Sequence, residues 1–190
     1  VPVANLIYGG NKTLECFSDH FLRRLESKSV IATSHRFHSV KLSSKELFQY
    51  PFVIMTGEGD FRLTEAERKN LKEYCEQGGF LLASAGCSSE SWDKAFRREV
   101  ENIWPDGKLK PIALDHPVFH TVFDIDSLRV KEGNAHSLEG LTIDGKLGVV
   151  YSRDGLNDTT HMSGCCCCGG NEILNAEQIN ANILAYALIF

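Results

Sequence analysis

A run of four cysteines, Cys165, Cys166, Cys167 and Cys168, is the part of this sequence with the most evident chemistry. Thiolate sulfur is a soft ligand that selects zinc, copper(I) or iron. Side chains of an extended segment alternate between two sides, so we expect two of the four thiols to face one ion. His161 is the nearest imidazole that could complete such a site. The run therefore predicts a thiophilic metal site or thiol redox chemistry.

Other outcomes stay open for the cysteine run. Adjacent Cα atoms lie about 3.8 Å apart, which is less than the ~4.4 Å minimum of ordinary disulfides, so neighbours are poor partners for one another. The chain has seven cysteines, and an odd number argues against a closed disulfide framework. The four thiols could stay reduced in an oxidation-prone loop or pair elsewhere. Alternatively, they could bind a metal together with His161, Cys87 or His116.

Several polar residues follow apolar runs that we predict to be buried strands. In parallel sheets, the loops that leave the carboxyl ends of the strands meet at one edge, where ligands bind. The residues that we expect to contact a small-molecule ligand at this edge are Gly10, Asn11, Glu58, Asp60 and Ser88. None of them belongs to a phosphate-binding motif, and the glycines are equally consistent with tight turns.

A strand–helix–strand unit is expected to position these loops. The apolar runs at 52–55 and 80–85 are typical of strands that are buried on both faces. Between them, Thr64 and Glu67 form a capping box that predicts a helix, and Gly78–Gly79 would end this helix. Two strands joined in this way form a βαβ unit, so the sequence predicts an α/β protein with a mainly parallel sheet.

The remaining periodic segments extend the same architecture. The other predicted strands lie at 3–8, at 30–32 or 37–40, at 109–114 and at 147–152, the last after an Asp144–Gly145 hairpin turn. The other predicted helices lie at 12–27, from the Ser88–Ser89 cap to 103, and after an Asn175 cap paired with Gln178. Residues 121–140 and 153–170 show no regular period. We expect residues 1–190 to form a single domain.

Composition limits the possible classes of function. A chain of 190 residues can bury a three-layer core. Its net charge of −5 argues against a general role on nucleic acids or membrane surfaces, which require a basic face. No run approaches the ~18 apolar residues of a spanning helix. The sequence begins without a signal peptide or an initiator Met, so we expect a processed chain of either cytoplasmic or exported origin.

Six segments carry a resemblance to a known family. They are YPF at 50–52, MTGEGDF at 55–61, GGFLLA at 78–83, AFRRE at 95–99, DHPVFH at 115–120 and VYS at 150–152. In this order and spacing they resemble the bacterial family called domain of unknown function 4159, a relative of class I glutamine amidotransferase-like domains. The resemblance implies a three-layer flavodoxin-like sandwich, but it supplies no reaction. Family members often carry His where this chain has Glu58.

The resemblance to amidotransferases also implies a catalytic hypothesis. In those enzymes a nucleophilic Cys lies on a strand-to-helix turn, where the helix N-terminus lowers the pKa of the thiol. Cys87 occupies the corresponding place, and His116 or His120 is the candidate base. However, residues 85–89 lack the Gly-x-Cys-x-Gly elbow, and His161 has no Glu two positions later. A Cys-dependent hydrolase or amidase is therefore an alternative, and an inert half-buried thiol is the simpler interpretation.

A third hypothesis is a non-catalytic domain that binds a ligand or a protein partner, because fold does not determine function. Of the three, we favour a thiophilic metal site or thiol redox chemistry at an edge that carries Glu58, Cys87, His116 and the cysteine run. This hypothesis depends on whether the fold brings these distant segments together.

Overall fold

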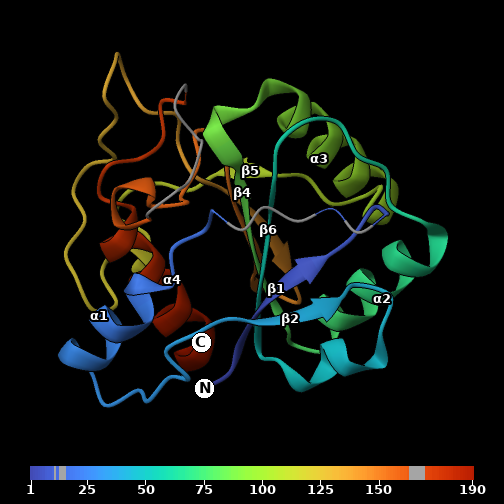
Figure 1. Ribbon diagram of the computed structural model, residues 1–190, viewed down its shortest axis with the longest axis horizontal. Helices are drawn as coiled ribbons and strands as arrows, with labels where there is room; N and C mark the ends of the chain where they lie inside the picture. The colour runs from blue at the N-terminus through green and yellow to red at the C-terminus, as the bar shows by residue number, and fades with distance from the viewer. Residues whose placement is uncertain (11, 13–15, 163–169) are drawn as a thin grey trace.

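A seven-stranded sheet forms the centre of the molecule, with the strand order β2-β1-β3-β4-β7-β6-β5 (Figure 1). The computed structural model describes residues 1–10, 12, 16–162 and 170–190. The strands are β1 (Val3–Ile7), β2 (His38–Lys41), β3 (Phe52–Gly57), β4 (Phe80–Ala85), β5 (Lys110–Pro111), β6 (Glu139–Ile143) and β7 (Lys146–Ser152). Neighbouring strands from β2 to β7 pair in parallel, whereas β6 is antiparallel to both β7 and β5.

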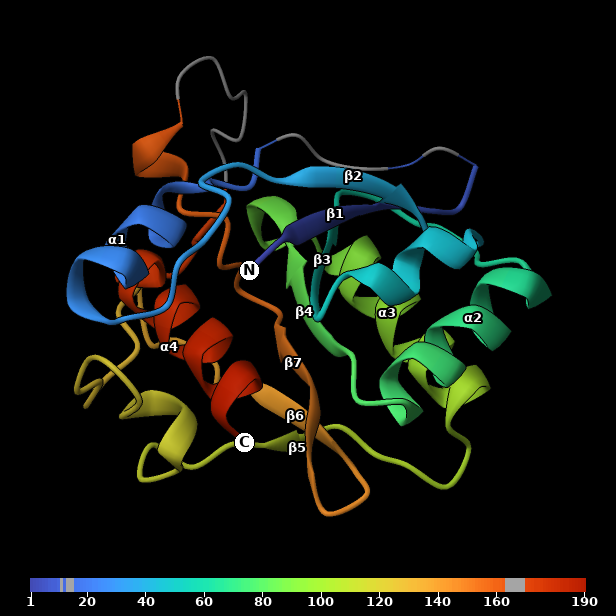
Figure 2. The same ribbon diagram turned by 90° about the horizontal axis from the view of Figure 1, so that it is seen from below.

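Helices cover both faces of this sheet (Figure 2). They are α1 (His20–Lys28), α2 (Glu65–Glu76), α3 (Glu90–Ile103) and α4 (Ala176–Ile189). The side chains of α2 and α3 share one apolar cluster with one face of the sheet, and those of α1 and α4 share a second cluster with the other face. The chain is therefore an α/β protein with a mostly parallel sheet. Within the described residues, no helix combines the length and the apolar character needed to cross a membrane.

The central βαβ unit confirms the prediction from the apolar runs. All residues of β3 and β4 are buried, and the two strands pair in parallel from Phe52–Phe80 to Gly57–Ala85. The capping box is present, because the Thr64 side chain accepts from the Glu67 amide and the Glu67 carboxylate accepts from the Thr64 amide. These contacts satisfy two amides that the first turn of α2 would otherwise leave unpaired.

The segment after β1 differs from the sequence prediction. A helix was expected at 12–27, but α1 begins only at His20. Lys12 instead pairs with Tyr8 through two backbone hydrogen bonds, and the Ser18 amide donates to the Asn157 carbonyl oxygen over 2.9 Å. These backbone contacts hold the segment away from helical geometry, although its apolar residues are still buried where the structure describes them.

Four further predictions at element boundaries can be compared with the structure. The alternative at 37–40 corresponds to β2, and β5 has only two residues of the strand expected at 109–114. The hairpin between β6 and β7 is confirmed, with φ of +50° at Asp144 and +84° at Gly145, as a primed turn requires. Helix α4 begins where expected, but Asn175 makes no side-chain cap hydrogen bond. Its carboxamide instead binds the backbone of Ser127 and Arg129.

A buried carboxamide joins the carboxyl ends of the central strands. Asn157 follows β7 and is fully buried. Its Oδ1 accepts from the Ser84 hydroxyl over 2.6 Å, and its Nδ2 donates to the Thr56 hydroxyl over 3.2 Å. The Ser84 hydroxyl in turn accepts from the Leu156 amide over 2.7 Å. The ends of β3, β4 and β7 therefore meet at one edge of the sheet, which we call the carboxyl edge.

We expect Asn157→Ala to lower the free energy of unfolding by about 2–4 kcal/mol, since it removes several buried hydrogen bonds and leaves Ser84 without its acceptor. Urea denaturation monitored by circular dichroism would measure the change. Asn134→Ala is the control, because Asn134 is exposed and its loss should change stability by less than ~0.5 kcal/mol. Equal effects of the two substitutions would contradict a structural role for Asn157.

Candidate functional site

Cys87 lies on a tight turn between β4 and α3. Within this turn, Gly86–Ser88, both Cys87 and Ser88 have a left-handed backbone, with φ of +53° and +54°. A non-glycine residue in this conformation costs of order 1–3 kcal/mol, and such residues cluster at functional sites. Because the 14-residue helix α3 begins at Glu90, the turn also places Cys87 beside a helix N-terminus.

Contacts from three other segments hold this turn in place. The Ser88 hydroxyl donates to the Asp154 carbonyl oxygen over 2.6 Å and accepts from the Asn171 amide over 2.9 Å. The Ser89 hydroxyl accepts from the Gly59 amide over 3.2 Å. Gly170 approaches so closely that an added Cβ would lie 2.5 Å from the Cys87 backbone. The strained conformation is therefore fixed by its surroundings.

The thiol of Cys87 and the carboxylate of Glu58 are directly paired. Sγ donates to Glu58 Oε1 over 2.8 Å. Glu58 is exposed and Cys87 is partly buried. A thiol and a carboxylate in this geometry can exchange a proton, which would convert the thiol into the nucleophilic thiolate. The fold thus brings together two residues that the sequence analysis expected at one edge.

A buried carboxyl group lies behind the turn. Glu172 is 9 % exposed, and burial raises the pKa of its carboxyl from 4.5 to about 7. The backbone amides of Cys87 and Asn157 favour the ionised form, whereas the charges of Glu58 and Asp158 oppose it. Glu172 Oε1 is buried and has no hydrogen-bond partner within the described residues. Glu172 also lines a cavity of about 140 Å³ together with Lys131, Asp158, Thr160 and Gly170.

One histidine at this edge was not predicted to take part. His136 pairs with Asp154 through two contacts of 2.6 Å, one from its backbone amide and one from its ring Nδ1. Asp154 is buried, and its carbonyl oxygen accepts from Ser88, so the pair lies next to the Cys87 turn. His136 falls in the stretch 121–140, which has no periodicity, and no local motif identifies it.

His116, the predicted base, is not brought to Cys87. Its ring contacts Tyr186 near the end of α4 at 5.5 Å, and it shares a cavity with Lys146 at the start of β7, so it lies at the amino edge of the sheet. Its Nδ1 accepts from the Val118 amide, and burial lowers the pKa of the imidazole. His120 is no better placed, because its ring bonds the Leu114 carbonyl oxygen and Asp124. Each imidazole therefore has other partners, and neither hydrogen-bonds Cys87 within the described residues.

The other predicted ligand-binding residues have mixed positions. Asp60 is exposed and forms an ion pair with Arg98 at 3.2 Å, so its carboxylate already has a cation beside it. Gly10 has φ of +81°, as expected for a turn glycine. Asn11 lies outside the described residues. Ser88 stabilises the Cys87 turn through the two hydrogen bonds given above.

The cysteine run, Cys165 to Cys168, also lies outside the described residues, so metal binding there stays a prediction. Cys16 is disulfide-bonded. Cys75 is a buried thiol whose pKa is raised strongly by burial, which makes it chemically inert.

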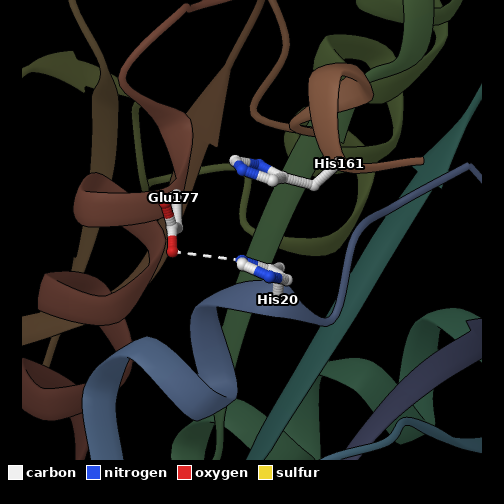
Figure 3. A group of neighbouring side chains, drawn as sticks. All are labelled: His20, His161 and Glu177. Atoms are coloured by element: carbon white, nitrogen blue, oxygen red, sulfur yellow. Dashed lines mark hydrogen bonds and ion pairs between the residues drawn. The ribbon is translucent and has the colours of Figure 1, made fainter. Parts of the chain in front are cut away.

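His161 is placed in a different group from the one expected. It lies beside His20 and Glu177, with the two imidazole rings stacked 4.4 Å apart (Figure 3). His20 and Glu177 were not predicted as ligands from the sequence. His20 and Glu177 each lie in the first turn of a helix, and they are more than 140 residues apart in the sequence. The sequence therefore gives only a weak signal that they form one group.

The strand–turn–helix around Cys87 defines an α/β protein with a thiol at the carboxyl edge of its parallel sheet. Residues 3–188 match the family described as Domain of unknown function (DUF4159), and the chain belongs to this family. A comparison with curated proteins gave no match.

Replacing Cys87 by glycine or alanine should measure the strain in the turn. Both substitutions remove the thiol, but only glycine adopts φ of +53° without steric cost. We expect Cys87→Gly to be more stable than Cys87→Ala by about 1 kcal/mol, as measured by urea denaturation. Equal stabilities would show that the turn relaxes when the thiol is lost.

Glu172→Gln should change how stability depends on pH. Because the pKa of Glu172 is about 7 in the folded protein and near 4.5 in the unfolded chain, its contribution to stability is complete below pH 4.5. This contribution is lost as pH rises through 7, by roughly 3 kcal/mol. Gln stays uncharged, so the variant should gain about 2–3 kcal/mol relative to wild type between pH 5 and pH 8. Urea denaturation of both proteins at pH 5 and at pH 8 measures this difference in the free energy of unfolding.

The control for this prediction is Glu101→Gln, which removes an exposed carboxylate from α3 and should leave the pH profile unchanged. Parallel profiles for wild type and Glu172→Gln would contradict the raised pKa.

Proposed function

We propose that this protein performs thiol chemistry at Cys87, with Glu58 as the proton partner of the thiol. The observation that carries the proposal is the strained turn whose Cys87 Sγ lies 2.8 Å from Glu58 Oε1. Backbone strain is retained where function requires a particular side-chain position. The partial exposure of Cys87 gives a small substrate access to the sulfur.

The surroundings of Cys87 favour the reactive form of the thiol. Peptide dipoles at the N-terminus of α3 stabilise a negative charge placed before its first turn. Glu58 accepts the proton that the thiol gives up, so the sulfur does not depend on solvent for its activation.

Redox chemistry fits this pair better than amide hydrolysis. Amide hydrolysis needs a group that protonates the leaving amine, usually an imidazole, and no histidine of the described residues hydrogen-bonds Cys87. Attack on a peroxide has a simpler requirement. A sulfur–oxygen bond forms as the oxygen–oxygen bond breaks, sulfur is oxidised to sulfenic acid, and the leaving oxygen takes the proton from Glu58. A second thiol can then condense with the sulfenic acid, which forms a sulfur–sulfur bond and releases the hydroxyl as water.

A Cys-dependent hydrolase or amidase is the second candidate, because the strand–turn–helix position of Cys87 is the one expected in a class I glutamine amidotransferase-like domain. We propose that the sheet belongs to this flavodoxin-like class. The strand order β2-β1-β3-β4-β7 supports this assignment. No imidazole of the described residues hydrogen-bonds Cys87, which favours the redox function over the hydrolytic one.

We expect Cys87 to react with hydrogen peroxide and to be trapped as a sulfenic acid by dimedone. It should also react with iodoacetamide at least about ten times faster than the buried Cys75 of the same chain. Glu58→Gln keeps a polar side chain but cannot accept a proton, so it should slow both reactions at pH 7 by about tenfold or more. Peptide mass spectrometry over time measures each rate.

Glu90→Gln is the matched control, since Glu90 is an exposed carboxylate in the first turn of α3 that does not contact the thiol. Its rates should equal those of wild type. A Cys87 that resists peroxide but turns over an activated ester or amide would replace the redox function by the hydrolytic one. An unreactive Cys87 would exclude both.

A further inference from the structure

Three side chains that could ligate a metal ion converge beside the carboxyl edge (Figure 3). His20 is the first residue of α1, Glu177 lies in the first turn of α4, and His161 ends the short turn Thr159–His161. One ligand atom from each residue lies within 4.8 Å of the other two. The first of these elements is far in sequence from the other two, so the fold is needed to assemble this group.

The separation of two of these atoms suits a shared metal ion. His20 Nδ1 lies 3.2 Å from Glu177 Oε1. Two ligands that each lie about 2.0–2.1 Å from a tetrahedral zinc ion are roughly 3.3 Å apart. The side chains of His20 and His161 are 51 % and 37 % exposed. The two rings stack nearly parallel, with 6° between their planes, and imidazole lone pairs lie in the ring plane, so one ring must turn before both nitrogens face one ion. The exposure of the His20 side chain leaves its ring room for this turn.

A buried carboxylate orients the second imidazole. Asp158 Oδ2 lies 2.7 Å from His161 Nδ1, which leaves Nε2 as the nitrogen available to a metal. Asp158 is 5 % exposed and is itself held by the Thr160 hydroxyl at 3.0 Å. A carboxylate behind a metal-binding imidazole fixes its tautomer and raises its basicity, and such partners are typical of metal sites.

The charges around the group are compatible with a divalent cation. The N-termini of α1 and α4 oppose a positive charge. The guanidinium of Arg24 also faces Glu177, at 4.0 Å. The carboxylates of Glu177 and Asp158 offset these effects. The Arg24 guanidinium also packs over the Phe123 ring, so Glu177 is not its sole partner.

We propose that His20, His161 and Glu177 bind one divalent transition-metal ion, with zinc as the expected ion. Two imidazoles and one carboxylate form a borderline ligand set, which suits zinc better than calcium or magnesium. Three protein ligands leave a fourth position for water or a substrate, as in catalytic zinc sites. None of the three proposed ligands is a cysteine.

Cobalt(II) titration of metal-stripped protein tests the site, because cobalt absorption reports the ligands. We expect one equivalent to bind with visible d–d bands and without a thiolate-to-cobalt charge-transfer band, and zinc should displace it. His20→Ala, His161→Ala and Glu177→Gln should each weaken binding by about 100-fold or more. Asp158→Asn should weaken it by 10–100-fold, as the loss of an orienting group does.

His35→Ala is the matched control, since His35 pairs with Glu26 and has no place in the three-residue group. It should bind cobalt as wild type does, and so should Cys87→Ser, which removes only the proposed thiol chemistry. A charge-transfer band from sulfur, or full binding by both His20→Ala and Glu177→Gln, would overturn the proposal. The proposal would also be overturned if no cobalt bound at a protein concentration of about 100 μM.

Discussion

The buried carboxamide of Asn157 is the constraint on which the carboxyl edge depends. It bonds Thr56 at the end of β3 and Ser84 near the end of β4. The backbone carbonyl oxygen of the same residue accepts from the Ser18 amide before α1. A buried carboxamide without partners would be costly, so these contacts must form together. One side chain thus fixes the loops that carry Glu58, Cys87 and Asp158 relative to one another.

The same edge concentrates features that reduce stability. Cys87 and Ser88 have left-handed backbones, and burial raises the pKa of both Glu172 and Asp158. Buried carboxyl groups with raised pKa values and strained backbone occur together most often where a protein acts on a ligand. The rest of the molecule follows the rules of stable packing, with apolar residues on both faces of the sheet. The carboxyl edge is therefore the part of the structure where residues lower the stability of the fold, and a functional role explains why they are kept.

Sequence patterns predicted those parts of the fold that short-range interactions determine. The strands β3 and β4, the capping box of Thr64 and the Asp144 turn each depend on residues that are close in the chain. The helix expected at 12–27 was wrong because its apolar spacing competes with backbone pairing between Tyr8 and Lys12 and with a bond to Asn157. That last contact joins residues 139 positions apart, from Ser18 to Asn157, and no local period could reveal it.

The same difference between short-range and long-range interactions determines which parts of the candidate sites could be predicted from the sequence. Glu58 and Cys87 could be placed together from the sequence because parallel strands send their following loops to one edge. His116 failed this argument, because it follows a two-residue strand, β5, after which the chain turns to the amino edge. Glu172 and the group of His20, His161 and Glu177 depend on how α1 and α4 pack together on the sheet. Sequence alone identifies which loops share an edge of a parallel sheet, whereas the packing of helices decides which side chains from those loops and helices meet.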